Sequence, residues 1–242
     1  MKTLIKKQTL LVFASLLLAT TAYAQSKSIK GNGNLTTVTR TTDSYDAIKC
    51  AGHMDFILVS GNEGNITIEG EDNLLEYIVT EVKDNVLKVK VKKGKNLKSS
   101  KNKTIKITIP FKDINKVALA GSGDLWNKDV INATNLVVAL AGSGDIVLDV
   151  KTTSVEGSIA GSGDLTLKGS TNYLKAKVAG SGDFHGFDLQ ANNTEVSVAG
   201  SGDAEVVSTD NLKARVAGSG DIVYKGNPKK DTKVSGSGSI TN

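Results

Sequence analysis

The 242-residue chain has very few cysteine, histidine, proline and aromatic residues, and each scarcity excludes a class of protein. The single cysteine, Cys50, excludes an internal disulfide framework, and we expect it to be a buried strand residue. The two histidines, His53 and His185, have no sequence neighbours that suggest a metal site or a catalytic triad. The only prolines, Pro110 and Pro228, fit strand ends.

Aromatic residues make up 5% of the chain, which leaves few platforms on which nucleic-acid bases could stack. The chain also lacks a strong excess of positive charge once the lysines of its N-terminal segment are subtracted. Removal of the three lysines in residues 1–24 leaves 27 basic and 25 acidic residues, so the sequence pI of 9.1 partly reflects targeting. Together these features exclude a nucleic-acid-binding protein.

The N-terminus has the pattern of a secretory signal peptide. Three lysines precede the apolar run of residues 9–19, and Ala22-Tyr23-Ala24 offers the small-x-small pattern of a cleavage site. We expect residues 1–24 to be removed and no later segment to cross a membrane, because no other apolar run is long enough. The protein is therefore expected to be exported to the periplasm, the cell surface or the medium.

A short motif, Ala-Gly-Ser-Gly-Asp, recurs along the second half of the chain at intervals of about 20 residues, a period typical of solenoids. An alternating apolar and charged segment precedes each copy, as in Leu174-Lys175-Ala176-Lys177-Val178, and a second short alternating segment follows it. One such coil cannot bury its own inner face, so the coils must stack with strands about 4.8 Å apart. The motif begins at Ala120, Ala141, Ala160, Ala179, Ala199 and Ala217, with a degenerate copy at Ser235.

The repeat therefore predicts an all-β fold, a right-handed β-helix or β-solenoid with about two strands per coil over residues 110–242. Glycine suits the turns because sharp turns need backbone conformations that residues with a Cβ adopt only at a cost. The predicted structural turn residues are Gly121, Gly123, Gly142, Gly144, Gly161, Gly163, Gly180, Gly182, Gly200, Gly202, Gly218 and Gly220.

Residues 25–109 are predicted to form an elaborated β-rich N-terminal part. The segment Ile48 to Leu58 follows the same order of strand, turn and strand, with His53 and Met54 in place of serine and glycine, and we interpret it as a divergent first coil. Further strands are expected at residues 65–69, 86–91 and 104–109, with a short helical turn at residues 73–78.

Three features of the chain occur together in one known family. They are an Asn-Leu-Leu-Glu-Tyr-Ile segment at residues 73–78, the serial Gly-Ser-Gly-Asp turns, and the ending Tyr-Lys-Gly-Asn-Pro at residues 224–228 before the degenerate copy. With these, residues 31–242 resemble the auto-transporter adhesin head domain family, also called GIN-domain proteins, which are exported proteins of Bacteroidetes and other bacteria. The resemblance implies a β-helical fold and an envelope or surface location, and it carries over no catalytic residues.

The most regular candidate site is a line of aspartates that closes each turn. Stacked in register, neighbouring carboxylates about 4.8 Å apart would repel by about 0.9 kcal/mol in bulk water. We expect backbone N–H groups within each turn to compensate, because aspartate commonly caps turns. Calcium is the alternative, as in the β-rolls of repeats-in-toxin proteins, although one carboxylate per coil supplies few of its six to eight oxygens. The aspartates are Asp124, Asp145, Asp164, Asp183, Asp203 and Asp221, with Asp55 in the divergent coil.

Paired carboxylates also occur in glycosidases and polysaccharide lyases, but a uniform line of equivalent aspartates lacks the unequal environments that acid–base catalysis needs. We therefore predict a protein that is not an enzyme and uses no cofactor. The lysine-rich residues 83–106 are interpreted mainly as a solvated strand face, with binding of anionic glycans or lipid headgroups as the alternative. Four aromatic residues could stack on sugars or pack the coils: Trp126, Tyr173, Phe184 and Phe187.

The sequence thus predicts an exported, adhesin-like binding or surface module of the cell envelope whose ligand is a cell-surface glycan or a protein. Two alternatives stay open, a structural or assembly module of the envelope and a polysaccharide-active enzyme. Because the final coil is short, association into a homo-oligomer that covers this end is a further expectation.

Overall fold

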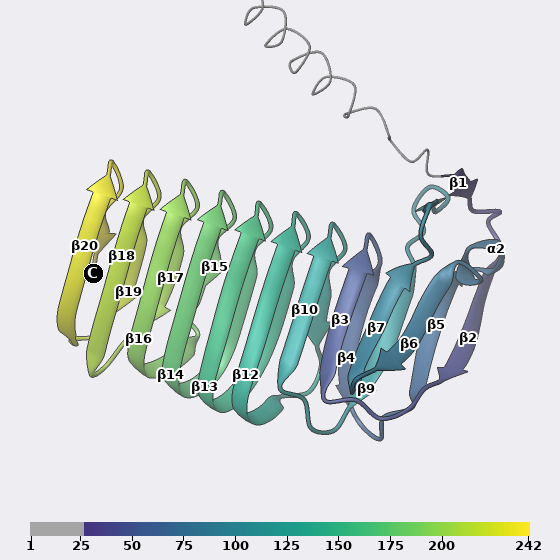
Figure 1. Cartoon of the computed structure of the whole chain (residues 1–242), viewed down its shortest axis with the longest axis horizontal. Coiled ribbons are helices and arrows are strands. Elements are labelled where there is room, and N and C mark those ends of the chain that lie inside the picture. The colour runs from purple at the N-terminus through teal and green to yellow at the C-terminus, as the bar shows by residue number, and fades with distance from the viewer. Residues whose placement is uncertain (1–26) are drawn as a thin grey trace, which may run out of the picture.

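The computed structural model describes residues 27–242, so the predicted signal peptide, residues 1–24, lies outside the described part of the chain. The described residues form a stack of parallel coils, a β-solenoid (Figure 1). One helical turn, α2 (Asp72–Leu75), interrupts the strands near the N-terminal end. Among the described residues no helix is long and apolar enough to cross a membrane. The predicted all-β solenoid is confirmed.

Strands that precede each turn pair in parallel and form one face of the solenoid, here called the pre-turn sheet. Their register holds the repeat in line, because Ala120 lies opposite Ala141 and Ala141 lies opposite Ala160. The strands are β3 (Ala47–Gly52), β10 (Lys116–Gly121), β12 (Ile131–Gly142), β13 (Ile146–Gly161), β14 (Leu165–Gly180), β16 (Leu189–Gly200), β18 (Asn211–Gly218) and β20 (Lys229–Gly236).

Strands that follow each turn form the opposite face, here called the post-turn sheet. Its members are β4 (Asp55–Ser60), β11 (Leu125–Asn127), the first parts of β13 and β14, β15 (Phe184–His185), β17 (Ala204–Val207), β19 (Ile222–Lys225) and β21 (Ile240–Thr241). In β13 and β14 the expected corner loop is part of the strand, because Ser154 still pairs with Tyr173 there. At this corner the hydroxyl of Thr152 also donates a hydrogen bond of 3.0 Å to that of Thr171, its partner in the next coil.

The core lies between the two sheets and consists of aligned aliphatic residues. Leu140, Ile159 and Val178 occupy the same place in successive coils and are at most 2% exposed. Cys50 is buried at this place in the divergent coil, and burial strongly raises the pKa of its thiol. Because each fully buried aliphatic side chain stabilises a fold by about 1.5–3 kcal/mol, stacking supplies what a single coil lacks.

Residues 48–58, which we interpret as a divergent coil, stack on the first regular coil, since Ala51 and Gly52 pair with Ala120 and Gly121. Ala51 and Ala120, 69 residues apart in the sequence, therefore lie in directly adjacent coils. Below this coil, β7 (Val86–Val91) pairs with β3, and β9 (Lys106–Phe111) pairs with β4. Two of the strands expected here match β7 and β9, and the third is β5 (Asn65–Glu71).

Antiparallel strands then close the N-terminal end. β6 (Ile78–Lys83) pairs with β7, β5 pairs with β9, and β2 (Leu35–Thr41) pairs with β5. β1 (Lys27–Lys30) pairs with β8 (Lys95–Lys98) beside them. The carboxylate of Glu71, only 1% exposed, joins these segments by accepting hydrogen bonds from Gly33 N at 2.5 Å and from Ser100 N at 2.8 Å.

The C-terminal end is covered by β20, which has polar residues at two of its inward positions and Val234, 41% exposed, at the third. At the inward positions of β20, Lys230 and Thr232 lie opposite the buried Leu212 and Ala214 of β18. The ammonium group of Lys230 donates a hydrogen bond of 3.0 Å to the hydroxyl of Tyr224 and lowers the pKa of that phenol. The inward side of the last strand of this sheet, β20, is therefore exposed to solvent and is not part of the core.

Candidate functional site: stacked turns and the outward sheet face

Close stacking of the turns explains both glycines of each motif. At the first glycine φ is positive, for example 139° at Gly161, and a Cβ there would lie 2.2 Å from the carbonyl oxygen of Gly142. The second glycine, Gly163, needs no unusual φ, but a Cβ there would lie 2.0 Å from the oxygen of Gly144. Contacts this short are forbidden to a methyl group, so the second glycine is required by the neighbouring coil.

In the divergent coil, where no such turn lies beneath, the second glycine is not required. Met54 occupies the place of the second glycine and its side chain is fully buried. The layer beneath, formed by β7 and β9, contains no Gly-Ser-Gly turn to collide with a Cβ. At Gly52 the nearest atom to a built Cβ is the methyl carbon of Met54, at 3.3 Å rather than the roughly 2 Å seen in later coils.

Each turn hydrogen-bonds to the turns on either side through its backbone. Ser162 N and Gly163 N donate to the carbonyl oxygen of Gly142 at 2.8 and 3.1 Å. Leu165 N donates in the opposite direction, to the carbonyl oxygen of Asp183 in the next coil, at 2.9 Å. The amide of Asp164 lies at the switch in direction, where the regular pattern offers it no carbonyl.

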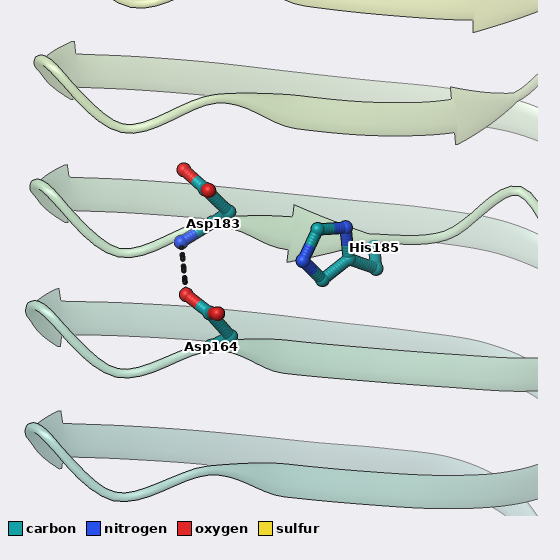
Figure 2. Close-up of side chains that lie close together, drawn as sticks. All are labelled: Asp164, Asp183 and His185. Carbon is teal, nitrogen blue, oxygen red and sulfur yellow. Dashed lines mark hydrogen bonds between the residues drawn. The ribbon is translucent and has the colours of Figure 1, made fainter.

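The aspartate side chains supply the missing acceptor. Asp164 N donates to Oδ1 of Asp145 at 2.9 Å. Asp183 N donates in the same way to Oδ1 of Asp164 at 2.8 Å (Figure 2). The same bond recurs along the stack, with lengths of 2.6–3.1 Å. The acceptors lie between coils, whereas the sequence had suggested caps within each turn. The predicted site aspartates are thus brought into one line: Asp124, Asp145, Asp164, Asp183, Asp203 and Asp221.

The line changes character at its two ends. In the final degenerate turn Ser239 replaces aspartate, and both its amide and its hydroxyl donate to Oδ1 of Asp221, at 2.6 and 2.9 Å. At the other end the Asp55 carboxylate accepts a long bond of 3.4 Å from the hydroxyl of Thr104. Burial, and then the nearby charge of Asp124, raise the pKa of Asp55.

The comparisons with known proteins agree with this geometry. The profile of the family described as "Putative auto-transporter adhesin, head GIN domain" matches residues 44–228. The chain belongs to this family. The expected resemblance is confirmed, and the matched range begins just before β3 and ends just before β20.

Three solved structures similar to this GIN domain come from Bacteroides and Parabacteroides species. A putative adhesin from Bacteroides fragilis is 27% identical with a TM-score of 0.82, covering 88% of this chain and 99% of its own. A putative lipid binding protein from Parabacteroides distasonis is 30% identical with a TM-score of 0.75, covering 89% and 99%. A putative adhesin from Parabacteroides merdae is 28% identical with a TM-score of 0.67, covering 88% and 98%. No relative was found among curated proteins.

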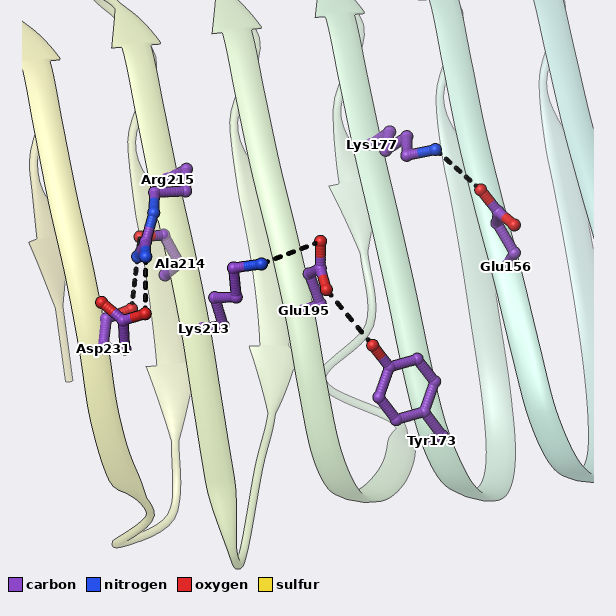
Figure 3. Close-up of polar contacts among 8 residues, drawn as sticks. All are labelled: Glu156, Tyr173, Lys177, Glu195, Lys213, Ala214, Arg215 and Asp231. Atoms are coloured by element: carbon purple, nitrogen blue, oxygen red, sulfur yellow. Dashed lines mark hydrogen bonds and ion pairs between the residues drawn. The ribbon is translucent and has the colours of Figure 1, made fainter.

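The aromatic candidates do not gather into one binding site in this GIN domain. Phe184 is fully buried in the core. The hydroxyl of Tyr173 lies 3.3 Å from a carboxylate oxygen of Glu195 on the pre-turn sheet (Figure 3). Phe187 lies under the ammonium group of Lys225, 3.8 Å from the ring centroid. Trp126 is half-buried on β11. These positions fit packing and local polar contacts.

The lysine-rich segment has the alternation that the sequence predicts. In β7, Leu87 and Val89 are fully buried, while Lys90 is exposed and forms an ion pair with Glu81 of β6 at 2.8 Å. This arrangement supports the interpretation of residues 83–106 as a solvated face. Lys88 lies beside the groove described below.

The outward face of the pre-turn sheet changes along the stack. In the C-terminal half, ion pairs link neighbouring coils, with Glu156 2.8 Å from Lys177, Glu195 3.5 Å from Lys213, and Arg215 2.6 Å from Asp231 (Figure 3). In the N-terminal half, the same face carries alanines and forms a shallow groove of about 470 Å³. Its floor and edges include Ala118, Ala120, Ala139, Ala141 and Ala160, with Lys49, Lys88 and Lys90 at one end.

Sequence reasoning missed this groove because outward positions were treated together as a charged face. A comparison of the repeats at one outward position would have found it. This position holds Lys177 and Arg215 in the C-terminal half but Ala118 and Ala139 in the N-terminal half. Substitution of charge by methyl groups at one place in successive coils leaves an apolar floor on an otherwise polar sheet.

Proposed function

We propose that this GIN domain is an exported, non-enzymatic, adhesin-like binding module of the cell envelope that contacts its ligand through the alanine-floored groove of the pre-turn sheet. Family membership and the adhesin names of similar structures support a binding role. The solenoid supports it physically, because a stiff stack with a continuous sheet presents a fixed surface without ordering cost on binding.

The observation that carries the proposal is the change in the outward face along one sheet. Lys177 and Arg215 each form an ion pair with a neighbouring coil. The residues in register with them in the N-terminal half are uncharged: Ala118, Ala139 and Ser158. Ala118 and Ala139 are half-buried, and Val137 beside them is 36% exposed. An exposed apolar patch bordered by charge is a common mark of an interaction surface.

The lining of the groove favours an amphiphile with an anionic head. An alanine floor offers methyl contacts but no side-chain hydrogen bonds, so it suits an acyl chain better than sugar hydroxyls. The ammonium groups of Lys49 and Lys88 at one end suit a phosphate or carboxylate head. The name of the similar protein from Parabacteroides distasonis, a putative lipid binding protein, supports the same ligand class.

The aspartate line supports a structural role for the turns and gives little support to catalysis. Asp145, Asp164 and Asp183 each commit one oxygen to a backbone amide in the same geometry, so the repeat sets no pair of carboxylates apart as acid and base. If the chain were a hydrolase or lyase, turnover of polysaccharides would be lost on single aspartate to asparagine substitutions.

The test is flotation of the purified protein with vesicles of phosphatidylglycerol and, separately, of phosphatidylcholine. We expect binding to the anionic vesicles, and Ala139→Glu, which places a carboxylate on the groove floor, should weaken it at least tenfold. The matched control is Ser197→Glu, which makes the same change in register with Ala139 but outside the groove. Absence of binding, or equal effects of both variants, would exclude the groove as the lipid site, and a glycan array would then test sugars.

A further inference from the structure

His185 breaks the pattern of the post-turn sheet at one coil. It follows the ladder residue Asp183 by two positions, where the other AGSGD coils have Trp126, Val147, Thr166, Glu205 and Val223. None of those five side chains is a nitrogen ligand for a metal ion. The imidazole is therefore confined to a single place beside the aspartate line.

At this place three candidate ligand groups converge. One ligand atom from each of Asp164, Asp183 and His185 lies within 4.8 Å of the other two, and all three residues are half-buried. Figure 2 shows both carboxylates and the imidazole near each other, with one ring nitrogen directed toward the aspartates. The donors come from two adjacent coils that the ladder already holds in register.

The hydrogen bonds around the cluster leave suitable atoms available. Oδ1 of Asp164 accepts from Asp183 N, and Oδ1 of Asp183 accepts from Asp203 N at 2.7 Å, so each carboxylate retains its second oxygen. On the far side of the ring, Nδ1 of His185 lies 3.5 Å from a carboxylate oxygen of Glu205. At metal centres, a histidine that binds the ion through one ring nitrogen is commonly oriented by a carboxylate at its other ring nitrogen.

We propose that Asp164, Asp183 and His185 bind one divalent transition-metal ion of the Zn²⁺ class, with Glu205 as the positioning residue for the imidazole. Two carboxylate oxygens and one imidazole nitrogen fill three positions of a tetrahedral site, and water fills the fourth. Metal–ligand distances of about 2.1 Å place donors about 3.4 Å apart, which side-chain rotation reaches from the present spacing. The ion would offset the repulsion between stacked carboxylates and link two coils.

The donor set also separates this site from the calcium alternative considered for the whole ladder. Calcium needs six to eight oxygen ligands, whereas the cluster offers a nitrogen and two free carboxylate oxygens. Zn²⁺, Ni²⁺ and Cu²⁺ accept mixed nitrogen and oxygen donors. We therefore expect binding of these ions at one coil only and no comparable binding of Ca²⁺ there.

The test is calorimetric titration of the untagged, purified chain with Zn²⁺. We expect one equivalent to bind with a micromolar Kd, and His185→Gln to raise that Kd at least tenfold. The control is His53→Gln, which removes the only other histidine and should leave the Kd unchanged. The side chain of His185 is 42% exposed, so its replacement should leave the fold intact, which far-ultraviolet circular dichroism checks.

A second readout identifies the ligands directly. In the Cu²⁺ complex, electron paramagnetic resonance should show coupling to a single imidazole nitrogen in the wild type and in His53→Gln, and none in His185→Gln. Asp183→Asn should weaken binding while its amide oxygen still accepts the ladder hydrogen bond. No binding at millimolar Zn²⁺, or equal affinity in wild type and His185→Gln, would overturn the proposal.

Discussion

The hydrogen bond from each aspartate to the next coil predicts a difference between two substitutions at Asp164. Asp164→Ala removes the oxygen that accepts Asp183 N–H at 2.8 Å, whereas Asp164→Asn keeps an amide oxygen in its place. Both substitutions remove the same negative charge. The relief of repulsion from the two neighbouring carboxylates, about 0.9 kcal/mol each in bulk water, is therefore common to both variants and cancels in the comparison.

What remains is the value of one neutral hydrogen bond and the cost of leaving a half-buried amide unpaired. A neutral hydrogen bond contributes about 0.5–1.5 kcal/mol, and an unsatisfied buried donor costs about 1–3 kcal/mol. For a partly exposed amide we expect Asp164→Asn to be more stable than Asp164→Ala by about 1–2 kcal/mol. The free energy of unfolding of Asp164→Asn should differ from that of the wild type by less than about 1 kcal/mol, because a weaker hydrogen bond and a lower repulsion between carboxylates offset each other.

Urea denaturation followed by circular dichroism measures this difference, provided that the slope m is the same in both variants. The exposed Asp188 provides a control pair, since no side-chain hydrogen bond is found for it among the described residues. Asp188→Asn and Asp188→Ala should agree within about 0.5 kcal/mol. Equal stability of Asp164→Asn and Asp164→Ala would refute the view that the aspartates hold the coils together as hydrogen-bond acceptors.

Four further predictions follow from the same geometry. Gly163→Ala should destabilise the fold by about 3 kcal/mol or more in urea denaturation, because its methyl group would lie 2.0 Å from Gly144 O, whereas Ser162→Ala in the same turn should cost under about 0.5 kcal/mol. Millimolar calcium should leave the melting temperature unchanged, and a rise of several degrees would show that the ladder binds it. The Ser100 hydroxyl, the amides of Ser100 and Gly33, and Lys103 lower the pKa of Glu71, so its stabilisation of the N-terminal end is present above the ordinary glutamate pKa and is lost as the pH falls through the lowered value. The protection factors of the amides in β1 and β8, which compare the observed exchange with the intrinsic rate at the same pH, should therefore fall in acid, and in Glu71→Gln they should be low at neutral pH as well. Contrary to the association expected from the short final coil, light scattering should find a monomer, because Lys230 and Thr232 cover the last coil, and the double variant Lys230→Leu, Thr232→Val should associate.

Much of the fold could be predicted because the solenoid repeats a local rule. The alternation of residues 174–178 identifies a half-buried strand, and the recurrence of the same five-residue turn fixes the register of one coil on the next. Even the divergent coil at residues 48–58 was recognisable, because Ala51, Gly52 and Asp55 keep their places. A one-residue slip would turn the aliphatic face outward, so few other registers compete.

The remaining features depend on contacts between coils that a single repeat does not contain. Nothing local distinguishes an aspartate that caps its own turn from one that accepts the amide 19 residues later, as Asp164 does for Asp183. Asp183 alone, two residues before His185, did not indicate a metal site, and the second carboxylate, Asp164, lies 21 residues away in sequence and one coil away in space. The antiparallel closure of the N-terminal end arises from pairings such as β2 with β5, for which the chain carries no repeat signal.

The central claim is that the turns hold the solenoid together while the alanine-floored groove binds the ligand. Nuclear magnetic resonance titration of the ¹⁵N-labelled protein with a short-chain anionic amphiphile such as dodecyl phosphate, below its micelle concentration, tests both halves at once. The largest amide shifts should fall on Lys49, Ala118, Ala139 and their neighbours in β3, β10 and β12, with little change in the Gly-Ser-Gly-Asp turns. Shifts concentrated at the turns, or none in the groove at saturating amphiphile, would contradict the claim.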